Sequence, residues 1–224
     1  MPNYGEKKYW VERYESEKGK TFDWLEDYES LKPMIKDLGI KKDDFILNVG
    51  CGNSEFSEKM YIDGFKNNYN IDICPNVINF MKERNKEKTN LIYKEMDARN
   101  MKDFKDETFD LVIDKSTIDA LLCGEEAFVN VALMTKEISR VLKTGGIYLV
   151  ISYGSPEYRL YHFKRKHLAF DVQVIQIKDK NNEASSHFAY ICKKLPEAKD
   201  KINNLNIVLK EMGKEITNIG DSDK

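Results

Sequence analysis

The chain has 224 residues, enough for one domain with a substantial core; 41% of them are hydrophobic and 33% are charged. Its 36 Lys and Arg residues nearly balance 38 Asp and Glu residues, which gives a formal net charge of -2. Such a balance does not indicate the excess of positive charge with which proteins bind nucleic acid or an anionic membrane. No apolar run approaches the roughly 20 residues that span a bilayer. We therefore expect neither a nucleic-acid nor a membrane partner.

The four cysteines are widely separated, and the chain has only three histidines. Neither set has the clustered spacing of metal ligands, so we expect no metal site. Isolated cysteines are typical of free thiols in a reducing compartment, and no secretory signal is visible. These features predict a cytoplasmic protein with four unpaired cysteines: Cys51, Cys74, Cys123 and Cys192.

The first 40 residues predict two helices, near Glu6–Glu17 and Asp27–Leu38, within the same domain as the rest of the chain. Both tryptophans of the chain, Trp10 and Trp24, lie in this part. From the residues alone, the simplest interpretation of these aromatic side chains is packing of an N-terminal helix against the core.

Strand-like runs then alternate with amphipathic segments, which indicates βαβ units around a parallel sheet. Helix ends are indicated at Asp63-Gly64 and at Lys143-Thr144-Gly145-Gly146. The predicted strands are Phe45–Val49, Tyr69–Ile73, Leu91–Lys94, Phe109–Asp114 and Ile147–Tyr153, with helices near Ser54–Asp63, Pro75–Asn85 and Glu126–Leu142.

Two further strands, Phe170–Ile177 and His187–Cys192, are joined by a polar turn and predict an antiparallel hairpin. The fold class expected is α/β, a Rossmann-like sheet of seven strands with an antiparallel last strand and helices on both faces. This is the methyltransferase variant of the architecture. The main domain is expected over residues 41–195, followed by a charged helix and a frayed tail over 196–224.

A Gly-x-Gly turn, Gly50-Cys51-Gly52, directly follows the first strand. Glycine there lets a ligand approach the backbone at the carboxyl edge of the sheet. The third glycine of the dinucleotide fingerprint is absent, which argues against a pyrophosphate more than against S-adenosylmethionine. An ordinary strand-to-helix turn is the alternative.

Acidic residues follow the second and third strands. Asp72 can accept both ribose hydroxyls, with Ile73 against an adenine face, unless Asp72 serves only the helix that begins at Pro75. Asp97, followed by Ala98, can accept the adenine amine, although an aspartate there is often only a turn residue.

The fourth strand runs into a polar loop, where Lys115 is expected along the cofactor. Asp114 and Asp119 are expected to face the substrate side, because ligands bind at this edge of open α/β sheets. The alternative is a loop that only caps the sheet.

Four segments in order resemble the eukaryotic elongation factor 1-alpha lysine methyltransferases, the group of methyltransferase-like protein 13 and lysine methyltransferase 4. The match covers roughly Tyr4 to Lys194. The resemblance implies S-adenosylmethionine as cofactor, S-adenosylhomocysteine as product and an elongation factor 1-alpha-like protein as substrate. The segments are Glu6–Tyr14 with its Tyr-Trp-x-x-Arg-Tyr element, Phe22-Asp23-Trp24, Leu47–Ser54 and Asp110–Leu122.

The same resemblance assigns roles to single residues, but it names no general base. An N-terminal aromatic lid would cover the methionine end of the cofactor, where aromatic faces attract a sulfonium. The implied cofactor-binding residues are Trp10, Tyr14 and Trp24 in the lid, Gly50 through its backbone, Asp72 at the ribose, Ile73 beside the adenine, Asp97 and Ala98 at the adenine edge, and Lys115.

The sequence differs from the family pattern at three places, which affects how far the family's roles apply to it. Asn48 stands where many methyltransferases carry an acid, Ser116 where relatives often have Gly, and Ser152–Phe163 differs in detail. The last segment is expected to shape the substrate mouth. A methyltransferase for a small molecule or another protein therefore stays open, as does a non-catalytic binding module. Base methylation is disfavoured, because an Asn/Asp-Pro-Pro-aromatic tetrapeptide is absent from the sequence.

Overall fold

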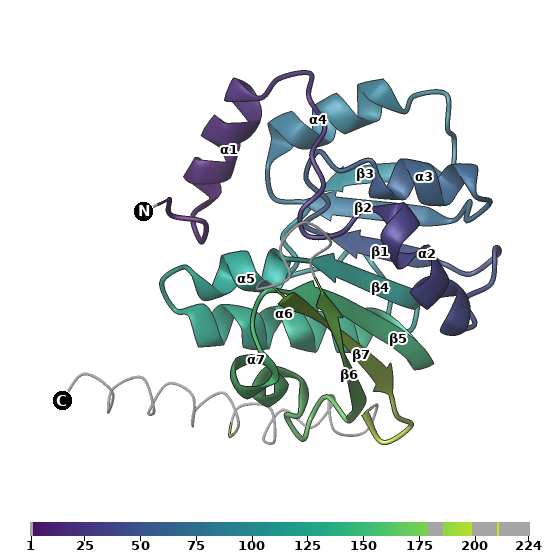
Figure 1. Cartoon of the computed structure of the whole chain (residues 1–224), viewed down its shortest axis with the longest axis vertical. Coiled ribbons are helices and arrows are strands. Elements are labelled where there is room, and N and C mark those ends of the chain that lie inside the picture. Colours follow the sequence, from purple (N-terminus) through teal and green to yellow (C-terminus); the bar gives the residue numbers. More distant parts are fainter. Residues whose placement is uncertain (1, 179–185, 199–209, 211–224) are drawn as a thin grey trace.

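The computed structural model describes residues 2–178, 186–198 and 210. A seven-stranded sheet in the order β3-β2-β1-β4-β5-β7-β6 forms its centre (Figure 1). The strands are β1 Ile46–Val49, β2 Asn68–Asp72, β3 Leu91–Glu95, β4 Phe109–Lys115, β5 Leu142–Ser152, β6 Phe170–Lys178 and β7 Ser186–Lys194. The helices are α1 Lys7–Ser16, α2 Tyr28–Asp37, α3 Phe56–Ile62, α4 Pro75–Arg84, α5 Thr117–Leu122, α6 Ala127–Val141 and α7 Pro156–Phe163.

Strands β1 to β5 pair in parallel, whereas β7 is antiparallel to both β5 and β6. Because β7 lies between β5 and β6, the last strand among the described residues is an inner strand of the sheet. The predicted fold class, a class I methyltransferase sheet with a reversed last strand, is confirmed.

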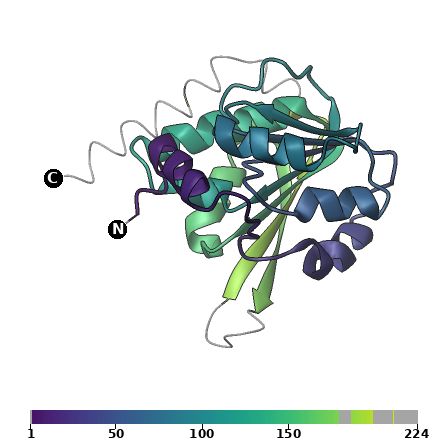
Figure 2. The same ribbon diagram turned by 90° about the horizontal axis from the view of Figure 1, so that it is seen from above.

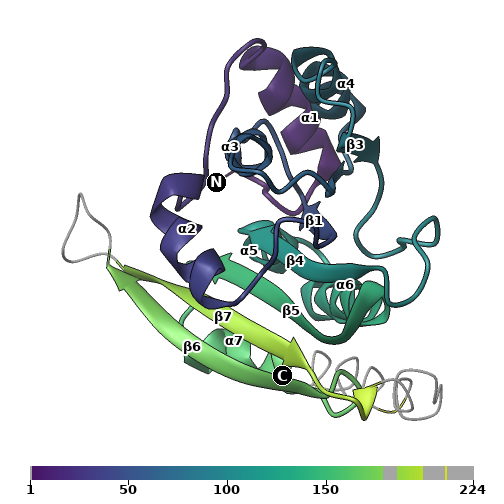
Figure 3. The same cartoon turned by 90° about the vertical axis from the view of Figure 1, so that its right-hand side faces the viewer.

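Helices cover both faces of the sheet, because its central strands bury alternate residues on opposite sides. Val112 and Val150 belong to one core cluster with residues of α5, α6 and α7, while Leu111 and Leu149 belong to another with residues of α2 and α3. Figure 3 shows α2 and α6 on opposite sides of the sheet. A third cluster joins α4 to β3 and includes Trp10 from α1.

The two N-terminal helices are separated in space although they are neighbours in sequence. Figure 2 shows α2 beside α3, away from α1. Helix α1 lies against α4, where the amide of Asn76 donates to the Val11 carbonyl at 2.9 Å. The segment between α1 and α2 consequently passes the carboxyl end of the sheet.

Three features differ from the prediction. Thr117–Leu122 forms α5 instead of a loop, and α7 occupies a segment for which no helix was expected. Helix α6 ends at Val141 and β5 begins at once, so the predicted stop at Lys143–Gly146 lies inside the strand. A register shift between β4 and β5 accommodates it, with Gly145 in the left-handed region at φ +81°.

Behind the glycine turn, Asn48 takes part in a buried network of amides and a hydroxyl. Its amide donates to Ser57 Oγ at 2.9 Å and to Asn68 Oδ1 at 3.1 Å. Ser57 also donates to Asn70. The uncharged amide of Asn48 therefore has its hydrogen bonds satisfied at the position where an acid was expected for many methyltransferases.

Residues 199–209 and 211–224, on which the C-terminal helix was predicted, lie outside the described residues. Within the described part of the chain, no helix is both long and apolar enough to cross a membrane. The same part has no group of three or more His, Cys, Asp or Glu side chains placed to hold a metal ion.

Candidate cofactor and acceptor site

A cavity of about 910 Å³ opens at the carboxyl ends of the parallel strands. Its position is the one that open α/β sheets use for ligands. All nine residues that the resemblance assigned to the cofactor line this single cavity: Trp10, Tyr14, Trp24, Gly50, Asp72, Ile73, Asp97, Ala98 and Lys115. Their contacts with the cofactor itself stay a prediction.

The glycine turn has the backbone that its sequence predicts. Gly50 and Gly52 are both in the left-handed region, with φ of +61° and +52°. A Cβ on Gly50 would lie 2.1 Å from Thr117 Oγ1, and one on Gly52 would lie 2.8 Å from the Tyr14 hydroxyl. The turn is therefore tightly enclosed by α5 on one side and by α1 on the other.

Asp72 ends β2 with its carboxylate buried beneath that turn. One oxygen accepts from the Gly52 N–H at 2.9 Å and the other from the Cys74 N–H at 3.0 Å. Burial raises the pKa of Asp72 above its ordinary value. Each oxygen keeps a second lone pair, so the group can hold the turn and still accept ribose hydroxyls.

Asp97 lines the cavity with its carboxylate already engaged. Arg99 donates to both oxygens, with Nη2 at 2.7 Å, and its Nη1 donates to Asn130 at 2.7 Å. Burial alone would raise the pKa of Asp97, but the hydrogen bonds from Arg99 outweigh it and the pKa is lowered. The predicted adenine contact would therefore share this carboxylate with Arg99, a partner that was not anticipated.

The N-terminal aromatic residues form one cluster at the cavity. Trp10 stacks on Tyr14 with ring centroids 5.9 Å apart and meets Trp24 edge-on at 6.1 Å. The Trp10 indole donates to the Tyr4 carbonyl at 2.6 Å. Tyr4 and Phe22, which sequence analysis did not select, also line the cavity. These side chains therefore cover the site as well as packing in the interior.

Arg13 holds this cluster from a position outside the cavity lining. Its guanidinium lies 4.9 Å from the Trp24 ring centroid, 5.4 Å from that of Phe22 and 5.7 Å from that of Trp10. Cation–π attraction to three rings fixes them relative to α1. The Arg in the Tyr-Trp-x-x-Arg-Tyr element was the available signal, but its partners are too far away in sequence to be identified.

Lys115 points toward the segment between α1 and α2. Its amino group lies 2.6 Å from Asp23 Oδ1 and donates to the Glu26 carbonyl at 2.8 Å. Asp23 also accepts from Ser54, which follows the glycine turn. Burial lowers the pKa of Lys115, although Asp23 opposes that shift. The observed role of Lys115 is thus to fasten the N-terminal segment to the end of β4.

The expectation that Asp114 faces the substrate is wrong. Asp114 is fully buried and is not among the cavity-lining residues. It accepts from the Thr117 N–H at 2.8 Å, the Ile118 N–H at 3.2 Å and the Tyr148 hydroxyl at 2.9 Å. Burial raises the pKa of Asp114 to about 7. The capping alternative is correct for this residue, because the start of α5 needs an acceptor for its free N–H groups.

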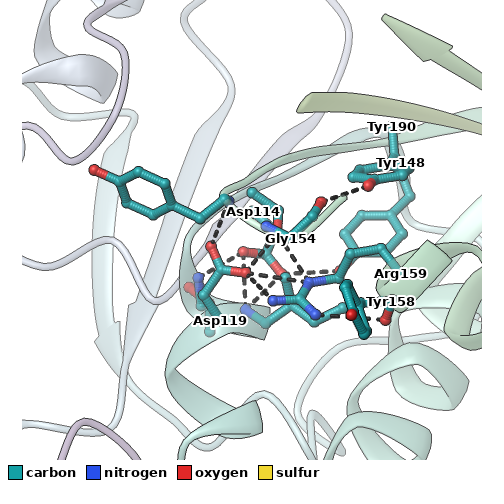
Figure 4. A network of polar contacts seen from close by, with 11 residues as sticks. Asp114, Asp119, Tyr148, Gly154, Tyr158, Arg159 and Tyr190 are labelled. Atoms are coloured by element: carbon teal, nitrogen blue, oxygen red, sulfur yellow. Dashed lines mark hydrogen bonds and ion pairs between the residues drawn. The ribbon is translucent and has the colours of Figure 1, made fainter. Parts of the chain in front are cut away.

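Asp119 does line the cavity, but it is paired with Arg159 of α7. Arg159 Nη2 donates to Asp119 Oδ1 at 2.8 Å, and the Tyr153 N–H donates to the other oxygen at 3.1 Å. Ser152 donates to Asp119 as well. Figure 4 shows the two side chains meeting beside Gly154 and Tyr190. Sequence analysis included Arg159 only as part of Ser152–Phe163, the segment expected to shape the substrate mouth, and gave it no role of its own.

Ser116 has a backbone conformation that favours glycine. Its φ is +65°, in the left-handed region, at the junction between β4 and α5. Its buried hydroxyl has no hydrogen-bond partner among the described residues. A serine here accepts a conformational cost that glycine avoids.

Fold and site together define a class I methyltransferase. The profile of a family described as "Methyltransferase domain" matches residues 40–206. The chain belongs to this family, and its cofactor is S-adenosylmethionine. The buried carboxylate at the end of β2, the two left-handed glycines and the adjoining apolar Ile73 fit the adenosyl part of that cofactor.

Individual relatives have names that state a substrate, which the family description does not. The chain is 37% identical over 194 residues to a mouse protein named eEF1A lysine and N-terminal methyltransferase, covering 83% of this chain and 27% of the relative. It is 31% identical over 169 residues to mouse EEF1A lysine methyltransferase 4, covering 71% of this chain and 66% of the relative. The chain thus spans about a quarter of the first relative's length.

Solved structures share the fold at low sequence identity. One from work on converting a disulfide bond into a thioacetal group during echinomycin biosynthesis has a TM-score of 0.68 at 13% identity, covering 92% of this chain and 99% of that one. A SAM-dependent methyltransferase from Methanosarcina mazei has a TM-score of 0.56 at 18% identity, covering 73% and 97%.

Proposed function

We propose that this methyltransferase acts on a lysine side chain of a protein, with elongation factor 1-alpha or a similar protein as its substrate. The main support for this proposal is the similarity to relatives that are named for that activity. The similarity to one of them, at 37% identity, extends over 83% of the chain. The cavity supports the proposal by having an adenosyl half, around the ends of β1 to β3, and a second half beside Asp119 and Tyr153. We further propose that the reaction takes place in the cytoplasm.

The reaction that this site serves is an in-line displacement. When bound, S-adenosylmethionine supplies a methyl group on a sulfonium and leaves as S-adenosylhomocysteine. The chain's own contribution is to bind, orient and exclude water, since alignment of two reactants is worth up to about 7–11 kcal/mol. The aromatic cluster of Trp10, Tyr14 and Trp24 suits the exclusion of water above the adenosyl half.

Transfer of labelled methyl groups tests the proposal. The purified chain is incubated with tritiated S-adenosylmethionine and elongation factor 1-alpha, and mass spectrometry locates the modified residue. We expect label on a lysine ε-amine, and none with the Asp72→Asn variant as the matched control. Label confined to the α-amine of the substrate, or to small molecules when a whole lysate is supplied, would overturn the lysine assignment.

A non-catalytic binding module is the remaining alternative, and the same assay addresses it. A protein that binds S-adenosylmethionine in calorimetry but releases no S-adenosylhomocysteine with any protein acceptor would support that alternative.

A further inference from the structure

Arg159 and Asp119 form the wall of the second half of the cavity, opposite the adenosyl half. Both line the cavity, and their side chains are only 13% and 16% exposed. The pair joins α5 to α7, the two helices that the sequence did not predict. Arg159 Nε also donates to Ser152 Oγ at 2.9 Å, which attaches the pair to the end of β5.

The guanidinium of Arg159 packs closely against its surroundings. A Cβ on Gly154 would lie 2.2 Å from Arg159 Cζ, so any larger residue there would push the guanidinium away from its present position. The Gly154 carbonyl accepts from the Tyr190 hydroxyl at 2.6 Å, which fixes this turn against β7. The positive charge is thus held beside the second half of the cavity by its hydrogen bonds to Asp119 and Ser152.

A lysine acceptor imposes a specific requirement on such a wall. Its amine must be neutral to attack, whereas a free lysine has a pKa near 10.4 and is protonated at neutral pH. An unpaired carboxylate beside the amine would stabilise the ammonium form, and a nearby cation would destabilise it. A paired carboxylate and guanidinium leave the amine free to lose its proton to water.

We propose that Arg159 is a positioning residue that neutralises Asp119, so that the acceptor amine reaches the methyl group unprotonated. This inference rests on the proposed function. The lone pair of the amine forms the new N–C bond as the S–C bond breaks, and the S–C electron pair remains on sulfur. The proton has already gone to water, so no general base is required of the chain.

Other charged and titratable groups surround the pair. The phenols of Tyr148 and Tyr190 have raised pKa values and stay neutral, and the pKa of His162 is lowered to about 3 by burial and by the nearby arginines. Asp114, with a pKa of about 7, titrates within the useful range. The groups facing the pair or its part of the cavity are Asp114, Lys115, Glu125, Tyr148, Tyr153, His162 and Tyr190.

The test compares the pH dependence of kcat for two single variants, at saturating S-adenosylmethionine and acceptor protein, between about pH 6 and pH 10. Arg159→Ala exposes the Asp119 charge, so the midpoint of the profile should rise by about one pH unit. Asp119→Asn leaves the cation alone, so the midpoint should fall by a similar amount. The double variant should return near the wild-type midpoint, even where its kcat is lower.

Two controls make the result decisive. Repeating the series in an Asp114→Asn background removes the neighbouring carboxyl that titrates, and the opposite shifts should persist. The affinity for S-adenosylhomocysteine and the melting temperature report whether each variant is folded, and Arg159→Lys should restore most of the wild-type midpoint.

A structural role for the pair would lower kcat in both single variants without moving either midpoint, and that outcome overturns the inference alone. Shifts that vanish in the Asp114→Asn background overturn it as well. If the wild-type chain methylates no lysine, the proposed function fails and the inference fails with it.

Discussion

The amino group of Lys115, at the end of β4, lies 2.6 Å from Asp23 in the segment that joins α1 to α2. This buried ion pair ties the aromatic cluster to the sheet edge at which the cavity opens. The two ends of that contact are 92 residues apart in the chain. The affinity for the cofactor should therefore depend on Lys115, although its amino group contacts the N-terminal segment of the protein.

Replacing Lys115 with Met removes the charge and leaves Asp23 uncompensated. Loss of one partner of a buried, hydrogen-bonded charge costs about 1–3 kcal/mol, so the Kd for S-adenosylmethionine should rise about 5- to 150-fold in calorimetry. Lys143→Met, which breaks the more exposed pair with Asp110 away from the cavity, is the control. Equal affinities in the two variants would contradict the fastening role.

Asp72→Asn should weaken cofactor binding more strongly than any lid variant. The amide can still accept one backbone N–H, so the glycine turn keeps part of its support, but the charge that is predicted to accept ribose hydroxyls is lost. We expect at least about a 100-fold rise in Kd, consistent with loss of two charge-assisted hydrogen bonds. The melting temperature without ligand measures the separate cost to the fold, and an unchanged Kd would remove Asp72 from the site.

The share of the stability that Asp114 supplies should fall as pH rises from about 4 to about 7, whereas His162, whose pKa is lowered to about 3, contributes the opposite trend. The folded pKa of Asp114, about 7, lies above the unfolded value, so at this residue the native state binds more protons in this window and favours the lower pH. The contribution is up to about 4 kcal/mol. Urea unfolding across the window should show that the unfolding free energy of the wild type minus that of Asp114→Asn falls as pH rises. A difference that stays constant would mean that Asp114 is ionised in the native state throughout.

Intrinsic fluorescence should report directly on the lid, because both tryptophans of the chain belong to the cluster that lines the cavity. Arg13→Ala should shift the emission to longer wavelength and raise the Kd for S-adenosylmethionine several-fold, since each cation–π contact contributes about 0.5–2 kcal/mol. Arg140→Ala, remote from both tryptophans in its contacts, is the matched control. An unchanged spectrum would show that Arg13 does not order the cluster.

The sequence predicted the adenosyl half of the site better than the acceptor half, for physical reasons. Asp72 and the glycine turn are each specified locally, by a strand end and by a backbone that only glycine adopts easily. Asp114 and Asp119 share the same short segment. Asp114 caps α5 through N–H groups three and four residues further on and also accepts from Tyr148, 34 residues away, whereas Asp119 pairs with Arg159, 40 residues away. Such partners are fixed by the fold, so the residue pattern could not separate a cap from a cavity wall.

Helices α5 and α7 were missed for a related reason. They have six and eight residues, too few for a clear helical period. The strands were predicted within a few residues because each is a buried apolar run bounded by turn residues. Lys115 illustrates the limit of a resemblance: it lies in the cavity lining as expected, yet its partner is the N-terminal segment.

The amide of Asn48, uncharged where many methyltransferases carry an acid, has a consequence for turnover. The cavity lining has five acidic side chains (Glu6, Asp72, Asp97, Asp119 and Glu125) against four basic ones (Lys7, Arg99, Lys115 and Arg159). Apart from the aromatic faces of the lid, the lining therefore supplies little net charge to favour the cationic donor over its uncharged by-product. S-adenosylhomocysteine should compete nearly as well as the donor, so the supply of modified substrate would follow how quickly other enzymes remove that by-product.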